Sequence, residues 1–215
     1  MRFGLKGITK SEVITHVLQH NVEEFSFDLR PKSFNFTQAY NIVSILKDFS
    51  TTGLNYQLIF ENEKDFVVKS VLEQIEKDLG EKRIFHLEFS GETSIAELDS
   101  YGNPYSLHFK EGRKIAELTG AKNLKRIIFH QKDLQLYADN NELYGFLQLF
   151  SDLDEIVEFE ILMEWDSQAI YSMFDYFPIK CLSFEVNNQV ELSYQTVDIT
   201  KVTNHLDFIQ NDLNT

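Results

Sequence analysis

The chain has 215 residues, of which 43% are hydrophobic, so residues 1–215 can bury a sizeable core as a single domain. It carries 34 acidic against 20 basic residues, and a formal net charge of -14 disfavours nucleic acids and membranes as partners, because such a surface repels phosphate and anionic lipid. The only cysteine, Cys181, excludes an internal disulfide and a cysteine zinc site, and the composition is typical of a cytoplasmic protein without a signal peptide or membrane span.

The first half of the chain alternates apolar strand-like runs with amphipathic helical patterns. Strands are expected at residues 2–8, 24–29, 56–60 and 84–89. Helical spacing of apolar residues follows the first three strands, and Thr9 and Thr37 stand where N-cap residues of two helices are expected.

The second half continues the alternation less regularly. Strands are expected at residues 105–109, 127–130, 157–163 and 181–186, and helices at 113–119, 142–150 and 167–174. Asp198 is expected to cap a last helix. Residues 99–104 contain Gly and Pro without a helical period, so the helical units within 99–180 are expected to be irregular or degraded. Eight strands with connections predict an α/β protein with a (β/α)8 TIM barrel, although the same periodicity also fits an open doubly wound sheet.

Five segments resemble a known family in order and spacing. They are Gly4–Thr9, Arg30–Ser33, Ile59–Glu63, Leu87–Glu92 and Glu185–Glu191. Together they resemble the motifs of phosphoribosylanthranilate isomerase, a barrel enzyme of tryptophan biosynthesis, and the distance on to Asp198 and Lys201 is similar as well. Residues 99–177 match in pattern only. The resemblance implies a barrel whose site lies at the carboxyl ends of the strands.

The resemblance also implies where chemistry should reside, and most of those positions are altered. The family uses a cysteine base on strand one, an aspartate acid on strand six, an arginine after strand two that steadies the anthranilate, and glycine-rich turns that hold phosphate. The corresponding positions here are Lys6 for the base, Phe129 or His130 for the acid, Asn35 for the arginine, Ser90 for a strand-four histidine, and Met163–Glu164 and Asn187–Gln189 for the turns.

Lys6 could replace the cysteine as a base only with a strongly lowered pKa. Burial would lower the pKa of the lysine, whereas Glu88, Glu164 or Glu185 nearby would raise it. The alternative role for Lys6 is a cation that neutralises acidic residues in the barrel mouth.

The phosphate turns lack their glycines, and Glu164 places a competing negative charge there, so a phosphorylated substrate is disfavoured. Asn187 and Asn188 could bind a neutral polar ligand, or simply form a turn. His130 is the best remaining general acid or base, and Asp133 could be a displaced acid. The other histidines lack metal-ligand spacing, so no metal and no cofactor are expected.

Phenylalanine is abundant, with 19 residues, and core packing is its expected role; several rings pointing into the mouth would shrink any pocket.

The favoured hypothesis is an isomerase-like barrel that has lost the reaction, a pseudoenzyme or binding protein. Two alternatives stay open: an enzyme of altered chemistry that uses Lys6, His130 and Glu164 or Glu185, and a still-active isomerase. Ligand contacts are expected at the mouth, where a small polar molecule or a protein partner could bind. The chain is expected to be a monomer or a homodimer. The mouth candidates are Asn35, Ser90, Glu164, Glu185, Asn187 and Asn188.

Overall fold

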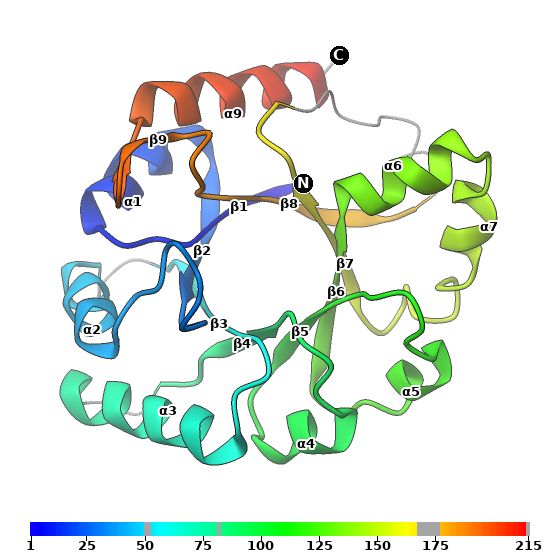
Figure 1. Cartoon of the computed structure of the whole chain (residues 1–215), viewed down its shortest axis with the longest axis horizontal. Coiled ribbons are helices and arrows are strands. Elements are labelled where there is room, and N and C mark those ends of the chain that lie inside the picture. Colours follow the sequence, from blue (N-terminus) through cyan, green and yellow to red (C-terminus); the bar gives the residue numbers. More distant parts are fainter. Residues whose placement is uncertain (50–52, 81–82, 167–176, 214–215) are drawn as a thin grey trace.

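Eight parallel strands close into a barrel in the computed structural model, which describes residues 1–49, 53–80, 83–166 and 177–213 (Figure 1). The strands are β1 (Arg2–Lys6), β2 (Val22–Asp28), β3 (Asn55–Phe60), β4 (His86–Phe89), β5 (Tyr105–His108), β6 (Leu124–His130), β7 (Glu158–Met163) and β8 (Ile179–Glu185). Each strand pairs with the next in chain order, and β8 pairs with β1. The predicted (β/α)8 barrel is therefore confirmed, because an open sheet would leave β1 and β8 unpaired with each other.

A ring of helices surrounds the barrel (Figure 1). The helices are α1 (Ser11–Val17), a 3-10 helix (Leu18–His20), α2 (Ala39–Asp48), α3 (Asp65–Leu79), α4 (Ile95–Ser100), α5 (Ile115–Thr119), α6 (Gln131–Asp139), α7 (Leu143–Gln148) and α9 (Ile199–Leu213). A small hairpin, β9 (Glu191–Ser193) with β10 (Thr196–Val197), precedes α9. Within the described residues, no helix is both long and apolar enough to cross a membrane.

The expected irregularity of the middle helical units is confirmed where the chain is described. Helices α4 and α5 have 6 and 5 residues, whereas α3 and α9 have 15 each. Short helices bury a smaller apolar stripe against the sheet, so this side of the barrel has a thinner outer layer. The helix expected at 167–174 lies outside the described residues.

One of the three expected helix caps is confirmed and two are wrong. The Asp198 carboxylate accepts a hydrogen bond from the Lys201 backbone N–H at 3.1 Å, which caps the start of α9. Helix α1 instead begins after Lys10, which makes no side-chain cap. Helix α2 begins after Gln38, so Thr37 lies one residue before the N-cap position, and its hydroxyl instead donates to the backbone carbonyls of Ile8 and Asn35.

The two faces of the strands have opposite character. Because side chains alternate along a strand, Leu5 faces the helices while Lys6 faces the barrel interior. The phenylalanines expected on strands all belong to the apolar core between sheet and helices, where they do not fill the mouth. They are Phe25, Phe27, Phe89, Phe129, Phe159 and Phe184 within strands, and Phe85 and Phe109 directly beside β4 and β5. The interior instead carries most of the buried polar and charged side chains.

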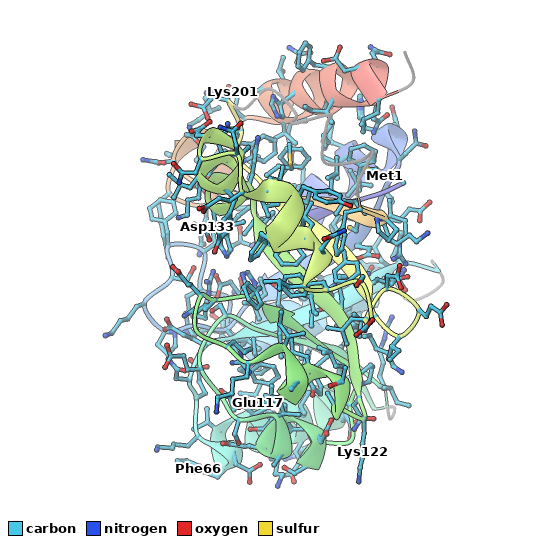
Figure 2. The ribbon with its side chains drawn as sticks, turned by 90° about the vertical axis from the view of Figure 1, so that its right-hand side faces the viewer. Met1, Phe66, Glu117, Lys122, Asp133 and Lys201 are labelled. Atoms are coloured by element: carbon cyan, nitrogen blue, oxygen red, sulfur yellow. The ribbon has the colours of Figure 1, made fainter. Side chains whose placement is uncertain are left out.

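The two ends of the barrel can be followed in the side view. Asp133, just after β6, and Lys201, in the first turn of α9, lie at the left end of Figure 2, whereas Met1 and Lys122, which precede β1 and β6, lie at the right end. The left end therefore carries the carboxyl ends of the strands, where barrels of this type place their sites.

Candidate functional site

Lys6 lies at the carboxyl end of β1 and is held by two carboxylates inside the barrel. Its Nζ is 2.6 Å from Glu88 Oε2 and 2.8 Å from Glu160 Oε1, and the residue is only 2% exposed. Burial alone would lower the pKa of Lys6, but the charges of Glu160 and Glu88 outweigh it and the pKa lies above its ordinary value. Lys6 is therefore a fixed cation at neutral pH.

The two carboxylates reach Lys6 from β4 and β7. Burial would raise the pKa of both, but Lys6, together with His108 for Glu88 and Arg126 for Glu160, holds both pKa values below the usual range. The Ser183 hydroxyl donates a further hydrogen bond of 2.5 Å to Glu160. Both groups are consequently ionised and fully engaged.

Arg126 continues the network toward the amino end of the barrel. Its Nη1 lies 2.5 Å from Glu24 Oε2 and 2.7 Å from Glu160 Oε2, and its Nη2 donates to Glu24 and to Glu158. Gln57 donates a hydrogen bond of 2.9 Å to Glu24. Two cations, Lys6 and Arg126, thus share the carboxylates that line the interior.

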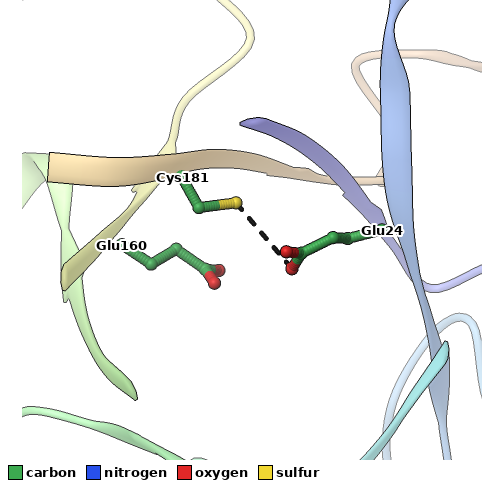
Figure 3. A group of neighbouring side chains, drawn as sticks. All are labelled: Glu24, Glu160 and Cys181. Carbon is green, nitrogen blue, oxygen red and sulfur yellow. Dashed lines mark hydrogen bonds between the residues drawn. The ribbon is translucent and has the colours of Figure 1, made fainter. Parts of the chain in front are cut away.

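Glu24, Glu160 and Cys181 form the group that most resembles a metal site (Figure 3). Their ligand atoms lie within 4.8 Å of one another, and the Cys181 thiol donates to Glu24 at 3.9 Å. Burial, followed by the charges of Glu160 and Glu24, raises the pKa of Cys181 well above its usual value, which keeps the sulfur protonated and a poor ligand. The guanidinium of Arg126 already supplies a cation to both carboxylates.

His130 is linked to Lys6 through two intermediate side chains. His108 Nε2 lies 2.7 Å from Glu88 Oε1, and His108 Nδ1 lies 2.8 Å from His130 Nε2. Burial, then His108 and the cations Lys132 and Lys6, lowers the pKa of His130 to about 3. Histidine 130 is half-buried at the end of β6 and is neutral at physiological pH.

Asp133 does not join this chain of contacts. It is exposed in the first turn of α6 and borders the same cavity of about 590 Å³ as His130, beside the segment that follows β5. The structure therefore brings Lys6 and His130 into one network, with Asp133 on the rim of a neighbouring cavity.

Asn35 and Glu185 are both engaged at the mouth. Asn35 is buried, and its amide donates to the backbone carbonyl of Val186, which ties the loop after β2 to the end of β8. The Arg30 guanidinium binds Asp28 and also Glu185, at 2.7 Å from Glu185 Oε1. The positive charge after β2 is thus supplied by Arg30, and two carboxylates neutralise it.

The turns after β7 and β8 are closed by their own contacts. The Glu164 backbone N–H donates to the Gln131 side chain at 3.0 Å, and the next residue, Trp165, is buried with its indole N–H on the Glu185 carbonyl at 2.6 Å. Asn187 accepts from the Gln189 backbone N–H at 2.9 Å, as in a self-closing turn, while Asn188 is exposed.

Ser90 stands at the end of β4 beside a glycine with a clear structural role. Its hydroxyl donates to the Phe60 carbonyl at 3.4 Å. A Cβ on Gly91 would lie 2.1 Å from Asn62 Oδ1 and 2.2 Å from the Glu61 carbonyl, so only glycine fits where these two loops meet. Gly7 similarly has φ of 77° and lies against Asn35. Gly7 and Gly91 belong to segments that carry the sequence resemblance, and both are needed for the loops to adopt their conformation.

Sequence reasoning missed the partners that define the interior. Glu160, Arg126 and Glu24 are not among the expected site residues. Of the acids expected near Lys6, Glu88 does bind it, and the second carboxylate comes from Glu160 in place of residue 164 or 185. The signal available was the alternation in Glu158-Phe159-Glu160, which puts two acids on one face of an otherwise apolar strand. Chemically, the network can hold charge and move a proton, but Lys6 has no free lone pair to offer.

No protein-family model matches the chain, and no curated protein matches it in sequence. Solved structures do match. The phosphoribosylanthranilate isomerase from Thermus thermophilus has a TM-score of 0.70 at 13% identity over 98% of this chain and 99% of its own. The isomerase from Thermotoga maritima has a TM-score of 0.69 at 13% identity over the full length of both. A putative dihydrodipicolinate synthetase from Pseudomonas aeruginosa has a TM-score of 0.57 at 11% identity, over 85% of this chain and 70% of its own. The chain therefore shares the barrel fold of the phosphoribosylanthranilate isomerases over its whole length.

Proposed function

We propose that this protein is a divergent barrel of the phosphoribosylanthranilate isomerase type that binds a ligand or partner but does not catalyse the isomerisation. One observation carries the proposal: Lys6, at the position of the family's base, lies 2.6 Å from Glu88 and 2.8 Å from Glu160. A general base needs an unprotonated atom within reach of substrate. Removing the proton from Lys6 would leave two buried carboxylates without their shared cation, so the network opposes that step.

The mouth supports the same proposal on the phosphate side. Glu185 faces Arg30, and Asp198 occupies the start of α9 with its carboxylate. A phosphate at this end of the barrel would need free backbone N–H groups and would meet acidic side chains instead. A neutral or weakly acidic ligand fits this surface better than a phosphorylated sugar.

An enzyme of altered chemistry is the second candidate, and one observation favours it. Lys6 and Glu185, which that hypothesis placed together, bind other partners, but His130 connects through His108 to the ionised Glu88. A carboxylate linked to histidine is a common arrangement for proton transfer. Any catalysis by this chain is therefore expected at His130.

The direct test is turnover of N-(5'-phosphoribosyl)anthranilate by the purified chain, with the Thermus thermophilus isomerase as positive control. We expect no product above the uncatalysed background, and no growth of a tryptophan auxotroph that lacks the isomerase. We also expect no binding of reduced 1-(o-carboxyphenylamino)-1-deoxyribulose 5-phosphate, the ligand held by one of the structurally similar isomerases. Turnover or complementation by the unmodified chain would overturn the proposal.

Three further properties belong to the proposal. Residues 1–215 act as one domain, the protein resides in the cytoplasm, and it is a monomer or homodimer. The Thermotoga maritima isomerase is described as dimeric, and monomers of it have been generated. Light scattering of the purified chain across a concentration series tests the oligomeric state.

A further inference from the structure

The hydrogen bonds around His108 fix which ring nitrogens carry protons. Glu88 is ionised and can only accept, so His108 Nε2, at 2.7 Å, must donate. When His108 is neutral its Nδ1 is an acceptor, and the contact of 2.8 Å requires His130 Nε2 to donate. His130 Nδ1 is then left with a lone pair, and it has no hydrogen bond to any described residue.

That lone pair belongs to a residue that borders a cavity. The cavity holds about 590 Å³ and lies between the segment after β5 and the helices α6 and α7. This size is in the range of small-molecule sites, which combine apolar walls with a few polar groups. His130 is half-buried and is one of the residues that line the cavity.

Four aromatic residues are among the thirteen that line the cavity, and charged residues such as Glu111, Asp133 and Glu142 also contribute to it. Phe109, Phe129, Tyr137 and Phe146 all line it, and Tyr137 stacks on Phe146 with ring centroids 4.1 Å apart. Such walls favour a flat, apolar molecule, because aromatic rings prefer stacked or edge-to-face neighbours. At the rim, Lys132 lies near enough to His130 to act on it electrostatically.

We propose that Glu88, His108 and His130 form a proton relay that serves this cavity, and that the cavity binds a small aromatic molecule with a weakly acidic O–H group, a phenol. The phenol donates to His130 Nδ1 while its ring packs against the aromatic walls. The site differs from the barrel centre around Lys6, and it is not the phosphate site that the family resemblance implies.

The proposed proton transfer forms one bond for each bond that it breaks. The phenol O–H bond breaks and its proton forms a bond to His130 Nδ1. The proton on His130 Nε2 moves to His108 Nδ1, so His130 is again neutral and His108 becomes an imidazolium beside Glu88. The phenol remains as a phenolate near Lys132, and nothing is oxidised or reduced.

The groups around His130 explain why the charge should move on to His108. His108 from β5, Lys132 from α6 and Lys6 from β1 disfavour a proton charge on His130, and Glu88 from β4 favours it. His108 is closer to Glu88, in direct contact, so a carboxylate stabilises the imidazolium there. His130 is the entry point and His108 the position where the proton is stored.

The test uses the full chain and 4-nitrophenol, whose phenol and phenolate forms absorb at different wavelengths. We expect saturable binding, with ionisation of the bound dye shifted to the acid side by about one pH unit, or about tenfold in the ratio of its two forms. His130→Gln keeps a nitrogen in place of Nε2 but removes Nδ1, and should weaken binding. His108→Gln keeps the bond to Glu88 but cannot pass a proton on, and should retain binding while losing the ionisation shift.

His86→Gln is the matched control, because His86 is also part-buried in the barrel but bonds to Ser106 instead of the relay. It should bind and ionise the dye as the unmodified chain does. Nitrogen NMR of the unmodified chain supplies a readout that needs no variant, and should show His130 protonated on Nε2. A proton on His130 Nδ1, absence of saturable binding, or an ionisation shift that survives in His108→Gln would overturn the relay. None of these results depends on isomerase turnover, so failure here is separable from failure of the proposed function.

Discussion

The inner and outer faces of the same eight strands bury different kinds of side chain. On β7, Phe159 and Ile161 face the helices within the apolar core, whereas Glu158 and Glu160 face the interior and bind Arg126. On β1, Leu5 and Lys6 divide in the same way. A single strand therefore contributes to two cores, one apolar and one ionic.

The difference shows how the fold and the site can change independently. The outer face buries the aromatic residues against the helices, and this burial is the main source of folding free energy. The inner face is held by charges that compensate one another, and replacing matched buried ion pairs with apolar groups is often neutral for stability. A barrel can consequently keep its outer core and alter its interior chemistry.

The largest expected effect comes from removing one charge of the ionic core. Lys6→Met keeps an unbranched side chain, one atom shorter, but leaves Glu88 and Glu160 without their shared cation. We expect the free energy of unfolding to fall by about 3–5 kcal/mol, the usual cost of breaking a buried ion pair from one side. Urea unfolding followed by circular dichroism measures the loss.

A paired variant separates charge balance from packing. Lys6→Met combined with Glu88→Gln removes one charge of each sign, so it should recover part of the lost stability. If the double variant is as unstable as the sum of its single variants, Lys6 acts through packing and the distinction between the two cores is wrong.

A smaller effect is expected from a shape change in the outer core. Phe159 packs against Phe129 and Phe177, with ring centroids at 5.9 and 4.1 Å. Phe159→Leu keeps an apolar side chain but loses these ring contacts, so we expect a cost of about 1–2 kcal/mol. Urea unfolding again provides the comparison, and a loss as large as that of Lys6→Met would show that the two cores are equally intolerant.

The sequence predicts the outer face far better than the inner one. Strand and helix periodicity report which residues face the helices, so the barrel and the helix cap at Asp198 could be anticipated. Interior partners come from strands that are distant in the chain: Lys6 meets Glu160 across 154 positions of sequence only because the barrel closes. No local pattern encodes that contact.

The mouth shows the same limit in another form. Asn35 is a predicted ligand contact, and the structure adds that its amide donates to the backbone carbonyl of Val186 after β8. Whether a polar loop residue faces a ligand or a backbone carbonyl depends on how two loops meet, which periodicity does not describe. His130 could be selected from its place at a strand end, but its link to Glu88 depends on His108 from the neighbouring strand.

The interior also predicts a dependence of stability on pH. Burial, then Arg126, lowers the pKa of His86 to about 4 from an unfolded value of 6.5. The unfolded chain therefore binds a proton that the folded chain does not, and stability falls as pH drops below 6.5. Glu88 and Glu160, whose pKa values are lowered, contribute stability above their unfolded value of 4.5 and lose it as pH falls further.

His86→Gln tests the histidine part of this dependence. Between about pH 7 and about pH 5, its stability should fall by about 1–2 kcal/mol less than that of the unmodified chain. His16→Gln changes an exposed histidine on the outer helix α1 and is the control. Equal acid sensitivity in the unmodified chain and His86→Gln would contradict a neutral His86 in the folded interior.

The smallest effect is expected for a lysine–carboxylate ion pair of the same length on the outer surface. Lys69 Nζ lies 2.8 Å from Asp65 on α3, the distance that also separates Lys6 from Glu160, but both partners are exposed. Water solvates the carboxylate that Lys69→Met leaves behind, so we expect a cost of about 0.3–0.5 kcal/mol. The N–O distances are equal, so the difference between Lys69→Met and Lys6→Met reflects the burial of Lys6 together with its second carboxylate, Glu88. Added salt should weaken the surface pair and leave the interior pair almost unchanged. Similar costs for the two variants would mean that water reaches the barrel interior, and that Lys6 is free to exchange its proton after all.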